Sequence, residues 1–509
     1  MRVLGVLAAG TLALTAGVQA ASAEDLIVAV QKNPDVVEPM RDFSNVGMRV
    51  IYNLAETLIE RDFKDDQRLV PGLAESWTRV DDRTIDFTLR QGVTCHNGEP
   101  LTAEDVAFTF GKERFQGEDA PGKRIGSILL GNLEPPEVLG EHKVRIRSKV
   151  PDAVLENRLA SYTAQIICKD AYLAAENWDS WSKALVATGP YKLTEFKPGE
   201  SIRIERFDDY WGEKAPADSV TFTVVPEAAT RLAGLLAGDF HIVTEVEPDQ
   251  LADIDARSGV VSAGGPIRNI RILLYDSMNG SALEDPRIRQ AMNLAIDRQL
   301  IVDALLHGRA KVPHGMQFDG YGEMFVAEAP KLVYDPEKAR ALIAEAGYDG
   351  APITLRTVGN YYAAERDTSE AIVNMWRDVG LDAQLVVVEN WDQIYEDNEA
   401  RNAQNSSATG FLNDPVGHLW RRFGPNDTTQ KRGFWTNAEF NELGGKLEAS
   451  TDMAERRALV ARMLEIVDED PPGALLFELP IFYGKVEGVN WQPYAHEYMD
   501  LRAGNLSFD

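Results

Sequence analysis

The chain has 509 residues, of which 80 are acidic and 52 are basic, so its net charge is −28. This length suffices for two or three domains of about 100–200 residues each. The acidic excess argues against nucleic acid as a partner, because neutralising phosphates needs clustered Lys and Arg. It also argues against binding to an anionic membrane surface.

The sequence lacks the short motifs that commonly mark catalysis. It contains no G-x-x-x-x-G-K-S/T loop, no G-x-S-x-G elbow, no H-E-x-x-H and no C-x-x-C. Its seven histidines are scattered without the spacing of metal ligands. We therefore expect no enzyme, no catalytic residues, no cofactor and no metal site. A glycoside hydrolase is the distant alternative, because an acidic chain offers many carboxylate pairs.

Residues 1–23 have the features of a secretory signal peptide. Arg2 supplies a positive charge, an apolar segment follows over residues 3–18, and Ala21-Ser22-Ala23 forms a small-residue cleavage site. A membrane anchor is the alternative, but the segment is short of a full span. No cysteine follows the apolar segment, so lipid attachment is not expected. The sequence predicts a soluble protein of the periplasm.

Residues 69–110 carry several local structure signals in a fixed order, LVPGLAESWTRVDDRTIDFTLRQGVTCHNGEPLTAEDVAFTF. Apolar and polar residues alternate over residues 85–89, which predicts a half-buried strand. Asn97-Gly98 predicts a tight turn. Thr102 can cap a helix with an acidic first turn, where the helix dipole favours negative charge. Upstream of this stretch, we expect a helix over residues 46–59.

The strings PGLAESW, DD and LRQGVTCHNGEPLTAEDV closely resemble the signature of periplasmic solute-binding proteins of the peptide/nickel import family, extracellular solute-binding protein family 5. Members of this family are receptors of ABC importers. TGPYKL at 188–193, DDYWG at 208–212 and a D-P-x-x-R-x-A-x-x-x-A-I-D run at 285–297 resemble further parts of the pattern. The family typically has Phe where this chain has Cys95.

The resemblance implies an α/β periplasmic-binding-protein fold of two lobes with mixed sheets, a hinge between the lobes and an extra subdomain in the first lobe. The expected parts after the signal peptide are a first lobe at 24–268 with the extra subdomain at about 60–185, a second lobe at 269–481, and a C-terminal return to the first lobe at 482–509.

The two cysteines, Cys95 and Cys168, both lie in strand-like segments. An oxidising compartment permits a disulfide between them, but the sequence does not give their separation. Two buried thiols that pack as small apolar residues are the alternative.

The loop at 359–362 leaves the carboxyl end of a predicted strand, where ligands bind in α/β folds. Asn360, Tyr361 and Tyr362 are therefore candidate ligand contacts, although the tyrosines could equally pack the turn. Dipeptide receptors of the resembling family carry an arginine in this loop that holds the carboxylate of the ligand. That position falls near Gly359, which puts a plain dipeptide in doubt.

A second candidate loop is TGFLNDP at 409–415. In the resembling family an Asp-Pro here carries the acid that pairs with the α-ammonium of a peptide. Asp414 matches it, with Asn413 beside it, but Asp-Pro is also a common turn or helix start. The remaining ligand candidates are aromatic residues that could stack on a solute or form core, and two positions near a helix start: Phe411, Trp391, Trp420, Trp435, Asn45 and Met48.

These patterns predict an extracytoplasmic receptor that captures a peptide or peptide-like solute between two lobes. An opine-type conjugate or an oligosaccharide is the alternative solute. The expected partners are the solute and the transmembrane permease subunits of an ABC importer, with ATPase activity on separate chains. We expect a monomer that binds no nucleic acid.

Overall fold

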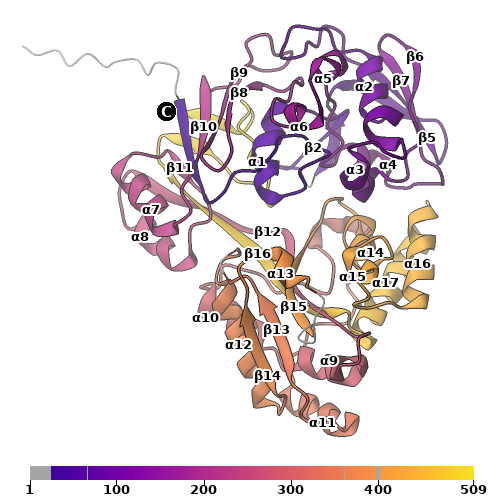
Figure 1. Ribbon diagram of the computed structural model, residues 1–509, viewed down its shortest axis with the longest axis vertical. Coiled ribbons are helices and arrows are strands. Elements are labelled where there is room, and N and C mark those ends of the chain that lie inside the picture. The colour runs from indigo at the N-terminus through magenta and orange to yellow at the C-terminus, as the bar shows by residue number, and fades with distance from the viewer. Residues whose placement is uncertain (1–24, 66, 360, 397–401) are drawn as a thin grey trace, which may run out of the picture.

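The computed structural model describes residues 25–65, 67–359, 361–396 and 402–509. Its two lobes share one mixed ten-stranded sheet (Figure 1), which confirms the predicted two-lobed α/β fold. In spatial order the strands are β14 (Ala383–Val387), β13 (Ile353–Thr357), β15 (Ala403–Thr409), β12 (Val260–Tyr275), β16 (Gly473–Val486), β11 (Ile242–Val243), β1 (Asp25–Val30), β10 (Ser219–Val224), β9 (Ser201–Arg206) and β8 (Tyr191–Lys197).

The first lobe, indigo to magenta in Figure 1, adds smaller sheets to its part of the large sheet. A four-stranded antiparallel sheet of β4 (Ala74–Arg79), β5 (Thr84–Leu89), β7 (Lys143–Arg147) and β6 (Glu137–Gly140) lies within the predicted subdomain. Two pairs complete the strands, β2 (Ile59–Asp62) with β3 (Arg68–Pro71), and β17 (Val489–Trp491) with β18 (Leu506–Phe508). The helical segments of this lobe are α1 (Asn45–Leu54), α2 (Ala103–Thr109), η1 (Lys112–Gln116), α3 (Lys123–Leu130), α4 (Leu155–Leu159), α5 (Lys169–Ala174), α6 (Trp178–Trp181), α7 (Ala228–Ala237), η2 (Pro248–Gln250) and α8 (Leu251–Asp255).

The second lobe places helices on both faces of its sheet, so it has two apolar cores. One core packs against α9 (Pro286–Leu294), α10 (Arg298–Leu305), α11 (Pro336–Ala346) and α12 (Glu365–Asp378). The other packs against η4 (Asp319–Met324), α14 (Leu419–Phe423), α16 (Ala438–Ala449) and α17 (Met453–Glu469). The short segments are η3 (Ala282–Glu284), α13 (Trp391–Ile394), η5 (Pro415–Gly417) and α15 (Thr428–Lys431).

Two long antiparallel strands, β12 and β16, run from one lobe to the other (Figure 1). Their register shifts between Pro266 and Ile270, where the chain passes between the lobes. Gly264 has a φ of +100°, and a Cβ there would lie 2.1 Å from the carbonyl oxygen of Ile481, so only glycine fits this close approach. The expected lobe boundaries at 268 and 481 fall inside these two strands.

The lobes are closed on each other. Phe411 of the second lobe packs into the core of the first, with its ring 4.6 Å from that of Phe43. Val154 of the first lobe packs into a core of the second. Arg158 on α4 forms an ion pair of 2.7 Å with Glu448 on α16, which crosses from lobe to lobe.

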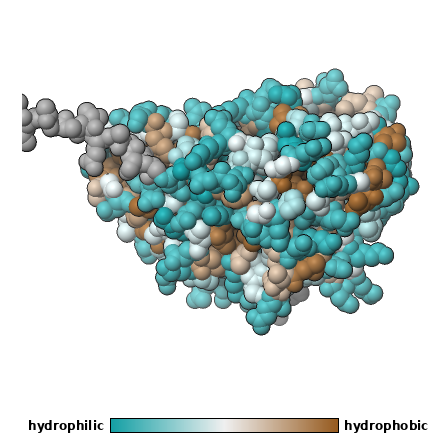
Figure 2. Space-filling model, turned by 90° about the horizontal axis from the view of Figure 1, so that it is seen from above, coloured by the Kyte–Doolittle hydropathy of each residue, from teal (hydrophilic) through white to brown (hydrophobic). Residues whose placement is uncertain are grey.

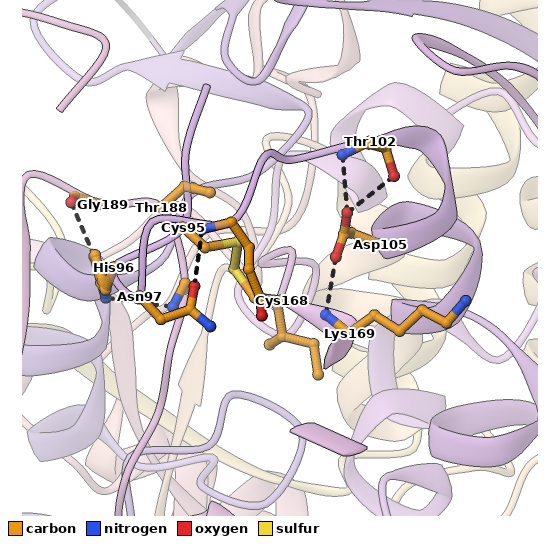
Figure 3. Close-up of a disulfide and its surroundings, with 12 residues drawn as sticks. Cys95, His96, Asn97, Thr102, Asp105, Cys168, Lys169, Thr188 and Gly189 are labelled. Atoms are coloured by element: carbon orange, nitrogen blue, oxygen red, sulfur yellow. Dashed lines mark hydrogen bonds between the residues drawn. A yellow bond between two sulfur atoms is a disulfide. The ribbon is translucent and has the colours of Figure 1, made fainter. Parts of the chain in front are cut away.

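Two local predictions need correction. The helix expected over 46–59 ends at Leu54, because residues 59–62 instead pair with β3. Cys95 and Cys168 lie outside the strands, yet they form a disulfide with a Cα–Cα distance of 6.3 Å (Figure 3). The predicted cap of α2 is confirmed: Thr102 accepts from the amide of Glu104, and Asp105 accepts from the amide of Thr102.

The face of the molecule seen in Figure 2 is mainly hydrophilic, with apolar residues in small groups. Within the part of the chain that the structure describes, no helix combines the length and the apolar character needed to cross a bilayer.

Candidate functional site

Two spaces lie between the closed lobes. The first, which we name the hinge cavity, has a volume of about 230 Å³ and is bounded by α1, the loop before α12 and residues 479–482 of β16. The second, the rim groove, has a volume of about 620 Å³ and lies between residues 153–157 of the first lobe and residues 321–324 of the second. Of the candidate residues from the sequence, Asn45, Tyr361 and Tyr362 line the hinge cavity, and Asn413 and Asp414 line the rim groove.

The N-terminus of α1 brings the first lobe to the hinge cavity. Ser44 caps this helix by accepting a hydrogen bond from the amide of Gly47, which fixes where the helix begins. Asn45 and Arg49, one helical turn apart, both line the cavity. Met48 does not line the cavity; it is fully buried in the core of the first lobe, so the structure places it away from the solute space.

The loop before α12 brings the second lobe to the same cavity. Tyr361 and Tyr362 line it, and their amides donate to the carboxylate of Glu365 over 2.7 and 3.2 Å. The Tyr362 hydroxyl donates to Ser407 over 2.8 Å. Trp391 packs edge-on against Tyr361 at 5.3 Å. These contacts hold an aromatic wall in place, while Asn360 lies outside the described residues.

Charged groups of both signs line the cavity. Both terminal nitrogens of Arg49 donate to the carboxylate of Glu245. Arg231 donates to main-chain carbonyls, including those of Thr244 and Glu245, and burial lowers its pKa to about 10. Burial also raises the pKa of Glu247. A cavity lined by positive and negative side chains suits a solute that carries both a positive and a negative charge.

Strained backbone flanks the cavity on both lobes. Glu245 has a φ of 46° and Ala364 a φ of 49°, both in the left-handed region. Non-glycine residues there cost roughly 1–2 kcal/mol each, and such strain concentrates at functional sites.

The backbone at Gly359 disfavours an arginine at residue 359, the position compared above with the carboxylate-binding arginine of dipeptide receptors. Its φ is +95°, and a Cβ there would lie 3.1 Å from Cγ1 of Val387. A side chain at residue 359 would therefore be strained by its backbone and crowded by β14.

The rim groove contains Asn413 and Asp414, but Asp414 is not a free carboxylate. Arg456 on α17 donates to both of its oxygens, at 2.8 and 2.7 Å, and the amide of Val416 donates to one of them. The carboxylate thus caps η5 and neutralises a buried arginine. The expectation that it pairs with the ammonium of a solute does not fit this arrangement.

The remaining aromatic candidates lie in packed positions. Phe411 contacts Phe43 across the lobes and lies under the guanidinium of Arg421. Trp420 and Trp435 belong to a core of the second lobe and donate to Glu448 and Asp470, respectively. The structure places these two tryptophans in the core and not along the hinge cavity, because their rings complete the packing of α14 and α16.

Sequence reasoning missed the charged residues of the hinge cavity. A signal existed for Arg49, because a basic residue inside the apolar helix NVGMRVIYNL needs a partner or a function. Glu245 and Arg231 carried no such signal, because their roles depend on contacts between segments far apart in the chain. In the described part of the chain, no three His, Cys, Asp or Glu residues are grouped to hold a metal ion.

The two lobes are joined by two long strands that both lobes share, and they close over a cavity lined by residues of both lobes. This arrangement defines the class of two-lobed α/β solute-binding proteins. The model of "Bacterial extracellular solute-binding proteins, family 5 Middle" matches residues 68–430. The chain belongs to this family, which confirms the resemblance seen in its sequence.

Individual relatives agree with this assignment. The chain is 26% identical over 448 residues to the dipeptide-binding protein of Escherichia coli K12, covering 81% of this chain and 82% of that protein. It is 27% identical over 506 residues to di/tripeptide-binding protein 1 of Pseudomonas aeruginosa UCBPP-PA14, covering 90% of each. The dipeptide binding protein of Pseudoalteromonas sp. SM9913, solved in complex with Met-Leu, has the same fold, with a TM-score of 0.84, 20% identity and coverage of 96% and 100%.

Proposed function

We propose that this protein is the solute receptor of an ABC importer and that it captures a peptide or peptide-like solute in the hinge cavity. The observation that carries the proposal is a cavity between the two lobes with charges of both signs beside an aromatic wall. A peptide presents an ammonium, a carboxylate and planar amide groups, which these side chains can bind. The family and the names of the relatives support the same solute class.

The partners follow from this role. The closed receptor would deliver its solute to transmembrane permease subunits, whose ATPase chains are separate. The receptor itself acts as a monomer in the periplasm after removal of its signal peptide, without a lipid anchor, and it leaves the solute chemically unchanged. Opine-type conjugates and oligosaccharides are outcomes that the same binding test distinguishes.

A thermal-shift screen of the ligand-stripped protein tests the proposal. The panel holds di- to pentapeptides, opines, and α- and β-linked oligosaccharides. A true solute at about 100 Kd should add about 2.7 kcal/mol to the free energy of unfolding. We expect peptides to raise the melting temperature, and chromatography of the recovered solute to show it intact.

Tyr361→Ala should abolish the shift, because it removes part of the cavity wall. Tyr334→Ala is the matched control, since Tyr334 is an exposed tyrosine of the second lobe. A shift from sugars or opines alone would replace the proposed solute class. Turnover of a panel member would contradict the receptor role.

A further inference from the structure

The guanidinium of Arg49 is a buried charge that lines the hinge cavity and pairs with a side-chain carboxylate. Arg49 is 2% exposed, lines the cavity and donates with both terminal nitrogens to the carboxylate of Glu245. Its buried Nε has no hydrogen-bond partner. Burying a charged donor without a partner is unfavourable, so Arg49 depends on the carboxylate of Glu245 for the hydrogen bonds of its terminal nitrogens.

Glu245 is a partly exposed partner for such a residue. Its side chain is 19% exposed against 2% for Arg49, and its backbone lies in the left-handed region at a φ of 46°. Besides Arg49, its carboxylate accepts from the hydroxyl of Thr244. The carboxylate therefore belongs to a strained residue that is partly exposed, between the buried neighbours Thr244 and Val246.

Arg231 provides an internal comparison. It also lines the cavity, but its donors go to the main-chain carbonyls of Val225, Pro226, Thr244 and Glu245. Main-chain carbonyls of a packed turn cannot leave, whereas a side-chain carboxylate can rotate away. Of these two arginines, only Arg49 has an anionic partner that a solute could replace.

We propose that Arg49 binds the carboxylate of the solute and that Glu245 occupies this position in the empty receptor as an internal stand-in. The inference rests on the proposed function of the hinge cavity. A solute carboxylate presents the same two oxygens in one plane and can take the place of Glu245 by paired hydrogen bonds. Glu247, which also lines the cavity, remains the negative group available to the ammonium of the solute. Affinity for the solute is reduced by the work of displacing Glu245.

Binding of alanine di-, tri- and tetrapeptides, each as free acid and as C-terminal amide, tests this arrangement by calorimetry. The wild type should bind the free acids at least tenfold more tightly than the amides. Arg49→Gln should remove this preference, and Arg49→Lys should retain part of it, because lysine keeps the charge without the planar fork. Arg257→Gln is the control, since Arg257 is an exposed arginine of the first lobe that does not line the cavity, and it should keep the full preference.

The variant Glu245→Gln is the decisive test, because the inference predicts that this variant binds free-acid peptides more tightly than the wild type does. It removes the stand-in charge, so the free acids should bind several-fold more tightly while the amides change little. Equal or weaker binding of the free acids to Glu245→Gln would overturn the inference, even if Arg49→Gln failed to fold. An unchanged preference in a folded Arg49→Gln would overturn it as well. If the wild type bound neither form of any peptide, the proposed function itself would be wrong.

Discussion

At the scale of single residues, Glu56 connects segments that are far apart in the sequence. Its buried carboxylate accepts hydrogen bonds from the hydroxyl of Tyr210 at 2.7 Å, the indole of Trp211 at 3.0 Å and the hydroxyl of Thr188 at 2.9 Å. The TGPYKL and DDYWG strings therefore meet at this one acid. Burial raises the pKa of Glu56 from 4.5 to about 7, and these hydrogen bonds lower it only in part.

The raised pKa of Glu56 predicts a specific pH dependence of stability. Between about pH 4.5 and 7 the folded protein holds a proton that the unfolded chain has lost, so stability falls as pH rises through this range. The effect amounts to roughly 3 kcal/mol, at about 1.4 kcal/mol per pKa unit. Urea unfolding at pH 4.5 and 7.5 should show the free-energy difference between wild type and Glu56→Gln shrinking by this amount. A difference that stays constant with pH would contradict the assignment.

At the scale of elements, the disulfide ties the turn after β5 to the start of α5. Cys95 precedes the Asn97-Gly98 turn, and Cys168 is the residue before α5. The bond closes a loop between residues 73 positions apart. Figure 3 shows that Asp105 lies nearby and accepts from the amides of both Thr102 and Lys169, which ties α2 to α5 beside the bond.

Removing the disulfide should destabilise the protein without changing solute binding. A loop of this length corresponds to about 4 kcal/mol in the chain-entropy model, and measured losses are commonly about 2–4 kcal/mol. The double variant Cys95→Ala/Cys168→Ala should lose this amount in guanidinium unfolding. Solute affinity should be preserved, because neither cysteine lines the hinge cavity. A reductant should destabilise the wild type and leave the variant unaffected.

At the scale of the whole molecule, one ion pair connects the lobes far from the hinge strands. Arg158 is held in its own lobe by Asp152 at 2.8 Å and by the carbonyl of Leu129. Glu448 is held in the other lobe by the indole of Trp420 at 3.1 Å. Because both partners are positioned before they meet, their pairing costs little side-chain entropy and favours the closed state.

Glu448→Gln should shift the receptor towards the open state. We expect a larger radius of gyration in small-angle X-ray scattering of the empty protein and about two- to tenfold weaker solute binding, because apparent affinity scales with the closed fraction. Lys446→Gln on the same helix is the control, since it breaks only an exposed pair with Glu442. Equal scattering and equal affinity for wild type and Glu448→Gln would show that the ion pair does not hold the lobes together.

The sequence predicted the parts of this protein that depend on neighbouring residues. Alternation over residues 85–89 gave β5, and Thr102 gave the start of α2, because periodicity and capping act within a few positions. The ordered strings gave the family. The helix expected over 46–59 was too long, because pairing of residues 59–62 with β3 is a tertiary contact.

By itself, then, the sequence determined the fold class, the family, and the two loops that carry Tyr361 and Asp414. Only the tertiary structure decided which of these side chains are available to a solute and which are already paired within the protein. Asp414 is occupied by Arg456, which lies 42 positions away, and Arg49 meets Glu245 across 196 positions. Such pairings depend on how strands and lobes come together, and local patterns within the chain do not record that geometry.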